Sequence, residues 1–138
     1  MNLDQNQNEA QRWLAQAKYD LAAAEHNAAG GFPALACFLA QQAAEKALKA
    51  FLYSKGERAV LGHSSYLLLR KCVDYEAGFE KLADGCRRLD QFYITTRYPN
   101  GLPGGIPHEM FGRDQAETAI TGARTVIEQV ATALPPVS

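Results

Sequence analysis

The sequence predicts an all-α protein, an up-and-down antiparallel four-helix bundle with one additional short helix. Three observations favour this fold class. Four long segments repeat apolar residues at steps of three and four, the period of a helix with one buried face. No segment alternates polar and apolar residues convincingly, so no strand is predicted. The chain has 138 residues, a length that suits a single domain built as a bundle.

The first predicted helix covers residues 9–28. Its apolar stripe includes Trp13 and Leu21, and a glycine pair followed by a proline ends it. The polar residues 1–8 show no helical period, so we expect a flexible lead-in there. The helical domain is accordingly predicted to span residues 9–138.

The second predicted helix covers residues 34–54 and has two neighbouring apolar rows at spacing four, which include Leu35 and Leu48. Many members of these rows are alanine, and small side chains allow another helix to approach closely. The rest of the helix surface is predicted to face solvent. It carries the polar residues Gln41, Gln42, Glu45, Lys46 and Lys49.

Two further helices are predicted in the middle of the chain. A short one runs to about Asp74 and can be capped by Ser64 or Ser65, with help from the neighbouring His63. A longer one covers residues 78–96, with Leu89 on its apolar stripe, and ends because a residue before proline is disfavoured in the α region.

A long loop and a last helix complete the predicted fold. Residues 98–113 contain four glycines and three prolines, and a loop of this length is more often functional or mobile than inert. The last helix is predicted to begin at Asp114, with Glu117 three residues later as in a capping box, and to close at a pair of prolines.

Composition excludes several classes of protein. The net charge of −1 argues against a protein that holds nucleic acid mainly through counterion release. No apolar run approaches the roughly 20 residues of a membrane helix, and the polar N-terminus does not resemble a signal peptide. We therefore expect a cytoplasmic protein without membrane contact. Three cysteines without metal-ligand spacing are predicted to be reduced core residues: Cys37, Cys72 and Cys86.

Motifs of common enzymes are missing from the sequence, including the phosphate-binding glycine loop, the HExxH zinc motif and the GxSxG nucleophile motif. The three histidines, His26, His63 and His108, do not lie on one predicted helix. Neither a metal site nor a cofactor is therefore predicted.

A candidate anion site is predicted where the fourth helix ends. Arg97 stands there beside Tyr98 and ahead of the glycine-rich loop, so it could hold a phosphate bidentately while the tyrosine stacks on a base. Asp90 could orient the arginine, and Lys46 and Lys49 could add charge if the two helices are neighbours. Two alternatives are that these charges are ordinary solvated ion pairs, or that Arg97 binds carbonyls at its own helix end.

Four segments resemble the HEPN domain family (the nucleotide-binding domain shared by higher eukaryotes and prokaryotes). They are the WLxQAxxDLxxA stretch of residues 13–24, the run AQQAAEKALKA of residues 40–50, the pair His63-Ser64, and DQFYITTRYP of residues 90–99. The resemblance covers nearly all of the chain after residue 9. It implies an up-and-down helical bundle that usually forms homodimers.

The resemblance also implies one of two activities. Some members are metal-independent ribonucleases with an arginine followed a few residues later by a histidine. Others are held to bind nucleotides or to partner a small nucleotidyltransferase, often as a toxin–antitoxin pair. In this sequence ten residues separate Arg97 from His108, and the chain instead resembles the branch with an R-Y-P ending.

We therefore predict a homodimeric binding module for a nucleotide, or for a small nucleotidyltransferase in a toxin–antitoxin-type pair. Its predicted ligand residues are Arg97, Tyr98, Asp90, Lys46, Lys49 and His63. One alternative is a metal-independent endoribonuclease that uses Arg97 and a displaced His108 on RNA. Another is a helical dimerisation or partner subunit without ligand chemistry.

Overall fold

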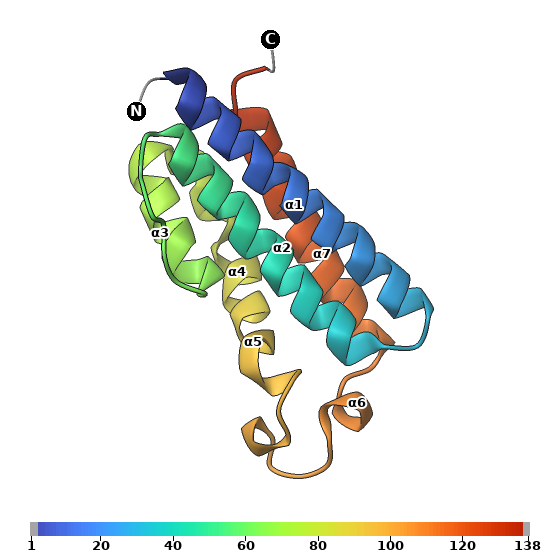
Figure 1. The fold of residues 1–138 in the computed structure, drawn as a ribbon. Coiled ribbons are helices and arrows are strands. Elements are labelled where there is room, and N and C mark those ends of the chain that lie inside the picture. The colour runs from blue at the N-terminus through green and yellow to red at the C-terminus, as the bar shows by residue number, and fades with distance from the viewer. Residues whose placement is uncertain (1–2, 137–138) are drawn as a thin grey trace.

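The structure, a computed structural model, describes residues 3–136, which form a helical bundle (Figure 1). Its elements, in chain order, are α1 (Leu3–Ala29), α2 (Pro33–Ser54), α3 (Ser65–Tyr75), the 3-10 helix η1 (Ala77–Leu82), α4 (Ala83–Asp90), α5 (Phe92–Thr95), the 3-10 helix η2 (Pro99–Gly101), α6 (Pro107–Met110) and α7 (Arg113–Ala133). No strand occurs among residues 3–136. The predicted all-α class is confirmed.

Helix α2 is the central element and packs against α1, α3, α4 and α7 (Figure 1). Its apolar rows are filled from within the protomer, because Ala40, Ala44 and Leu48 are all fully buried. The alanines let α1 and α7 approach closely. This small-residue face was one reason to expect a homodimer, and the structure shows instead that α2 uses it inside one chain.

The start of α1 differs from the prediction. The helix begins at Leu3, so residues 3–8 belong to it rather than to a lead-in. Asn6 is buried, and the amide nitrogen of Gln7 donates to the Ser54 carbonyl at 3.3 Å. Contact with the end of α2 therefore stabilises a helical conformation in residues 3–8, although this polar segment has no helical period of its own.

The polar side of α2 was predicted to face solvent, and for much of its length this is wrong. Gln41 is 0% exposed, Glu45 3% and Lys49 6%. These side chains are covered because α1, α3, α4 and α7 pack around much of the central helix. Leu35 is the opposite error, since it is 44% exposed although it continues an apolar row.

The predicted helix over residues 78–96 is three elements in the structure, η1, α4 and α5. Residues 77–82 wind as a tighter 3-10 helix. At Gln91, between α4 and α5, the backbone N–H bonds to the Arg88 carbonyl three residues earlier, at 3.2 Å. Such short-range bonds are typical of 3-10 turns at helix ends.

Two short helices interrupt the predicted loop of residues 98–113. Each begins at a proline, Pro99 in η2 and Pro107 in α6. Proline is well suited to the first helical position because its fixed φ matches the helix and its missing N–H would have no partner there. The prolines therefore both end one helix and begin the next short turns at the lower end of the bundle in Figure 1.

The helix caps agree with the prediction for α3 and differ for α7. Ser64 caps α3 with its hydroxyl oxygen, which accepts from the Leu67 N–H at 3.0 Å. Helix α7 begins one residue earlier than predicted, at Arg113. Its cap uses Gln115, whose side-chain oxygen accepts from the Gly112 N–H at 2.9 Å. Asp114 and Glu117 do not form the expected capping box.

All three cysteines are buried and free of disulfides, as predicted. Burial raises the pKa of the Cys37 thiol to about 12 and that of Cys86 to about 12, and it raises the pKa of Cys72 still further. Because the thiolate is the reactive form, we expect no labelling of the native protein by a thiol reagent at pH 8. After unfolding in guanidinium, three thiols per chain should react; rapid labelling of the native state would contradict the burial.

Neither a membrane-spanning helix nor a metal-binding cluster occurs among residues 3–136. None of their helices has the length and apolar character needed to cross a membrane. Within residues 3–136, no group of three or more histidine, cysteine or carboxylate side chains is arranged to hold a metal ion.

Candidate functional site

Arg97 lies just beyond the end of α5, with its guanidinium group among three aromatic rings. The guanidinium carbon is 4.5 Å from the centre of the Phe38 ring, 4.6 Å from that of Tyr93 and 5.2 Å from that of Tyr98. Contacts of this kind are favourable cation–π interactions. Three such contacts restrict where the guanidinium group can lie, and its planar fork of N–H donors suits a bidentate anionic partner.

One hydrogen bond to a described residue holds the Arg97 side chain. Its Nε donates to the Tyr93 carbonyl at 2.8 Å, so the arginine does bind a carbonyl of its own helix end, as one alternative expected. Within the part of the chain that the structure describes, Arg97 forms no ion pair and its terminal nitrogens make no hydrogen bond. These donors are therefore available to an anionic ligand.

His63 extends the same aromatic group. Its ring stacks on Tyr93, with centres 5.1 Å apart and planes 15° from parallel. The His63 Nδ1 is 3.4 Å from Oε1 of Glu45, and the histidine side chain is 63% exposed while the carboxylate is buried. His63 was also expected to help cap α3, but its carbonyl accepts from Gln41 at 2.7 Å and its side chain takes no part in the cap. A buried carboxylate thus positions an exposed imidazole beside Tyr93.

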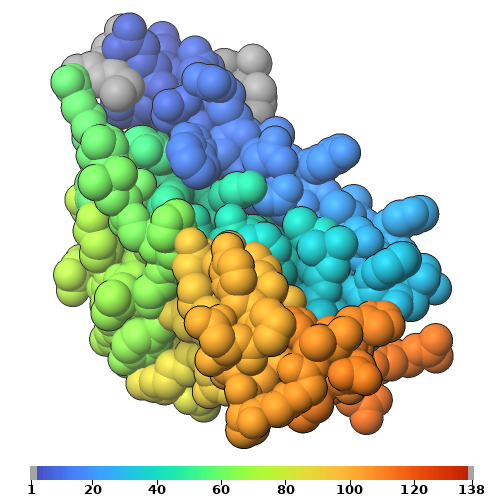
Figure 2. Space-filling view, turned by 60° about the horizontal axis from the view of Figure 1, so that its bottom comes forward, coloured from blue at the N-terminus to red at the C-terminus, as the bar shows by residue number. Residues whose placement is uncertain are grey.

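Arg97 and His108 line one hollow of about 290 Å³, although a long segment separates them in sequence. Figure 2 shows this end of the molecule, where the orange segment covers the end of the bundle beside the cyan start of α2. The other lining residues come from the start of α2 and from the segment around α6: Phe32, Ala34, Leu35, Thr96, Ile106 and Pro107. The structure therefore brings together the arginine and histidine of the ribonuclease alternative within one protomer.

Asp90 is not the partner of Arg97 that the sequence suggested. One carboxylate oxygen accepts from the Ser65 N–H and hydroxyl, both at 2.7 Å, and the other accepts from the Ser64 hydroxyl at 2.6 Å and the Tyr66 N–H at 3.0 Å. The Gln41 amide also reaches it at 3.4 Å. A negative charge at a helix N-terminus is favourable, so Asp90 holds the start of α3 against α4.

The two predicted lysines point away from Arg97 and toward α1. Lys46 pairs with Asp20 at 2.6 Å. Lys49 pairs with the buried Glu45 at 3.2 Å, and its ammonium lies 5.6 Å from the centre of the Trp13 ring. Both lysines therefore have partners that join α1 to α2 or neutralise a buried carboxylate.

Sequence reasoning missed three residues of the site: Phe38, Tyr93 and Glu45. A signal existed for Tyr93, since it precedes Arg97 by one helical turn and residues four apart share a helix face. Glu45 and Phe38 lie on α2, and nothing in the local sequence indicates that Glu45 meets His63 or that Phe38 meets Tyr93 and Arg97. Of the predicted ligand residues, Tyr98 contacts the Arg97 guanidinium and His63 stacks on Tyr93.

Comparisons with known proteins add to this geometry. The family model described as "HEPN domain" matches residues 10–133 of the chain. This chain belongs to the HEPN domain family. Every candidate site residue of this HEPN domain, from Phe38 to His108, lies inside the matched region. Among proteins with curated descriptions, none is significantly similar to it.

Solved structures of related proteins share the fold of this HEPN domain. TT1696 from Thermus thermophilus is 38% identical, with a TM-score of 0.84 and coverage of 92% of this chain and 99% of that one. ST0689, described as an archaeal HEPN homologue, is 31% identical, with a TM-score of 0.78 and coverage of 92% and 98%. The HEPN domain protein TM0613 from Thermotoga maritima is 31% identical, with a TM-score of 0.71 and coverage of 91% and 99%.

Proposed function

We propose that this HEPN domain is a binding module for a nucleotide, with its phosphate held by Arg97. The observation that carries the proposal is the guanidinium group enclosed by three rings without an ion-pair partner among the described residues. The rings keep the guanidinium group in place, and its terminal nitrogens can donate two parallel hydrogen bonds to a phosphate. A chain with a net charge of −1 can bind an anion in this way, because the positive charge of Arg97 acts on the ligand at short range.

The base of the nucleotide is proposed to stack on the exposed aromatic side chains near Arg97. Tyr98 is 50% exposed, and the exposed His63 ring is held in place by Glu45 and Tyr93. Stacking on such rings is tolerant of base identity because every base has a π face. Asp90, Lys46 and Lys49 are left out of this site because each is engaged in the interior contacts described above.

Binding is expected to depend strongly on Arg97. Arg97→Ala should weaken the binding of AMP and ATP by about 30-fold or more, since a charge-assisted bidentate contact is worth roughly 2–3 kcal/mol. Isothermal titration calorimetry measures this loss, and a thermal melt checks that the fold is kept. Arg12→Ala is the matched control, because Arg12 on α1 is 81% exposed and pairs with Glu9 one turn earlier.

Two further titrations sharpen this test. Arg97→Lys keeps the positive charge but loses the planar guanidinium that can donate two parallel hydrogen bonds. Its affinity for AMP should therefore lie between those of the parent and of Arg97→Ala. Tyr98→Ala should weaken AMP binding more than inorganic phosphate binding, because the ring contacts the Arg97 guanidinium and is also proposed to stack on the base. Equal affinity in the parent and Arg97→Ala would remove Arg97 from the site. Absence of nucleotide binding in the parent would favour the partner subunit without ligand chemistry.

The toxin–antitoxin-type partnership with a small nucleotidyltransferase is also part of the proposal. It is supported by the resemblance of residues 90–99 to the R-Y-P branch of the family. Co-expression with a nucleotidyltransferase encoded beside the gene, followed by co-purification, tests it. A binding partner that carries a nucleotide or a phosphorylated group could then supply the anion for Arg97.

A metal-independent endoribonuclease is the second candidate, and the hollow shared by Arg97 and His108 favours it. A histidine near a positive group can act in general acid–base catalysis without a metal. RNA cleavage that persists with a chelator and is lost in both Arg97→Ala and His108→Ala would establish this activity. Cleavage that survives either substitution would exclude this pair of residues.

A further inference from the structure

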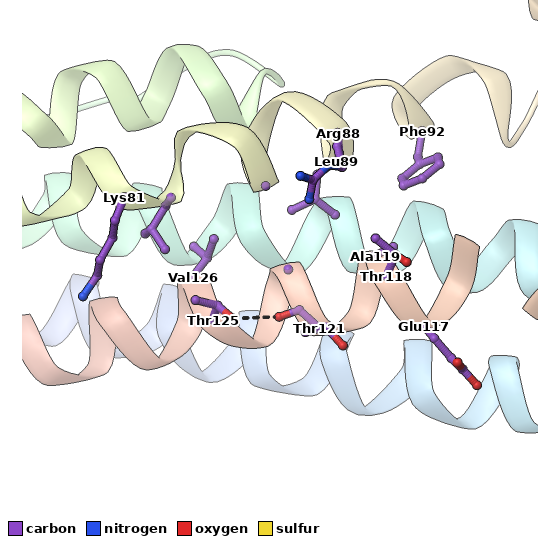
Figure 3. Close-up of a pocket in the computed structure, with 13 residues that line it drawn as sticks. Lys81, Arg88, Leu89, Phe92, Glu117, Thr118, Ala119, Thr121, Thr125 and Val126 are labelled. Carbon is purple, nitrogen blue, oxygen red and sulfur yellow. Dashed lines mark hydrogen bonds between the residues drawn. The ribbon is translucent and has the colours of Figure 1, made fainter. Parts of the chain in front are cut away.

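A groove of about 420 Å³ runs between α7 and the opposite wall formed by η1, α4 and the start of α5 (Figure 3). Its volume falls within the roughly 300–1,000 Å³ that is usual for sites of small organic molecules. It shares no lining residue with the hollow at Arg97. Nucleotide binding at Arg97 therefore gives this groove no role.

The inner surface of the groove is apolar. Leu82, Leu89 and Val126 line it, and each is at most 4% exposed because most of its side chain is packed into the core. Phe92 is half-buried and lines the same groove. Covering apolar surface of this kind releases water and is favourable, so the groove suits a ligand with an apolar chain.

Two glycines leave room in the groove, Gly85 on α4 and Gly122 on α7. A Cβ atom added to Gly85 would meet no atom within 4 Å, and one added to Gly122 would make ordinary contact with Leu89 at 3.8 Å. Neither glycine has a positive φ, so the backbone does not require glycine at these positions. The missing side chain at Gly85 leaves the space above this part of α4 unfilled.

Two cations flank Gly85. Lys81 precedes it by four residues, Arg88 follows it by three, and both line the groove. Residues at these spacings lie on one side of a helical segment, so both long side chains can reach a group above Gly85. Within the part of the chain that the structure describes, neither side chain forms an ion pair or a hydrogen bond. Both positive charges are therefore available to a ligand.

The far end of the groove is negative. Figure 3 shows Lys81 at one end and Glu117 at the other, with Arg88 between them on the α4 side. Glu117, too, has no ion-pair partner among residues 3–136. Its carboxylate repels an anion and the two cations attract it, so the charges favour one direction for a ligand that has an anionic head and an apolar tail.

From these observations we propose that the groove binds the anion of a medium-chain fatty acid, with its carboxylate above Gly85. Lys81 and Arg88 hold the carboxylate, and the guanidinium fork of Arg88 matches it geometrically. The alkyl chain lies over Leu89 toward Phe92.

The length of the groove supports a medium chain. Its lining residues on α7 run from Glu117 to Val126, about 14 Å at the rise of 1.5 Å per residue. A long-chain fatty acid would extend beyond this span. The proposal is independent of nucleotide binding at Arg97.

Calorimetric titration with octanoate, below its micelle-forming concentration, tests the proposal. The parent should bind one octanoate per chain and should bind octanol, which has the same chain without the charge, at least about tenfold more weakly. Lys81→Gln and Arg88→Gln should each weaken octanoate binding by about threefold to tenfold and leave octanol binding unchanged, because only the carboxylate contacts the cations. Lys18→Gln on α1 is the charge control, since Lys18 is exposed and lies outside the groove.

Gly85→Leu tests the position of the ligand. The leucine side chain fills the space above α4, so octanoate binding should weaken by about tenfold or more. The melting temperature should be kept or raised, because leucine favours a helix more than glycine does. Gly104→Leu is the matched control, since a Cβ added there also meets no atom within 4 Å and Gly104 does not line the groove.

Three results would each overturn the proposal. The first is a parent that binds no octanoate, as expected if another protein chain fills the groove in solution. The second is equal affinity of the parent for octanoate and octanol, which would show an apolar groove without an anion site. The third is a Gly85→Leu protein that binds octanoate as tightly as the parent does, which would place the ligand elsewhere.

Discussion

Leu48→Asp unfolds the domain. Leu48 lies on the central helix and is fully buried, so the substitution removes its apolar contacts and places a carboxylate where the interior provides no partner for it. Losing a buried leucine side chain costs about 2–5 kcal/mol, and an unpaired buried charge adds several more. Together these losses are comparable to the whole free energy of unfolding of a typical domain, about 5–15 kcal/mol.

Circular dichroism at 222 nm during a thermal melt measures this effect. Leu35→Asp is the matched control, because it makes the same change on the same helix at a position that is 44% exposed. We expect the control to retain a cooperative transition with a loss below about 1 kcal/mol. A Leu48→Asp protein that melts within a few degrees of the parent would show that this face of α2 is not core.

Asp90→Ala lowers the free energy of unfolding by about 3 kcal/mol, or roughly 10 °C in melting temperature for a domain of this size. The side chain accepts hydrogen bonds from Gln41, Ser64, Ser65 and Tyr66. Removing it leaves the first N–H groups of α3 without their acceptor, and the buried Gln41 amide keeps only its bond to the His63 carbonyl. The effect is large because one carboxylate joins α2, α3 and α4.

Asp84→Ala is the control for this substitution. Asp84 lies on the same helix, is 80% exposed, and pairs with Arg87 at 2.8 Å. An exposed pair of this kind contributes little, so we expect a change below about 0.5 kcal/mol. Asp90→Asn should fall between the two variants, because it keeps one acceptor and loses the charge. Equal melting temperatures for Asp84→Ala and Asp90→Ala would contradict the role assigned to Asp90.

The helical period of the sequence predicted the starts of α2 and α7 to within one residue, but it placed the start of α1 six residues too late. It also predicted the Ser64 cap of α3, because a cap is a contact between residues close in sequence. The breaks inside residues 77–96 were not predicted. Apolar spacing is nearly the same for a continuous α-helix and for short helical pieces that share one stripe, so periodicity alone does not separate them.

In the candidate site, too, some residues could be predicted from the local sequence and others could not. Local sequence was enough to select Arg97 and Tyr98, since an arginine at a helix end before a glycine-rich segment is recognisable without a fold. The partners of Arg97 were not recognisable. Phe38 reaches the site from α2 and His63 from the segment before α3, and only packing brings these segments to one end of the bundle.

The sequence by itself determined the fold class, the helix stripes and the local chemistry of Arg97, because each depends on residues within one or two helical turns. The tertiary structure decided which polar residues are interior. Gln41, Glu45 and Lys49 share a polar face by spacing, and the helices packed around α2 bury these three residues along with most of its apolar face. It also turned Asp90 from a proposed ligand residue into the anchor of α3, because a charge pairs with whichever donors the fold brings near it.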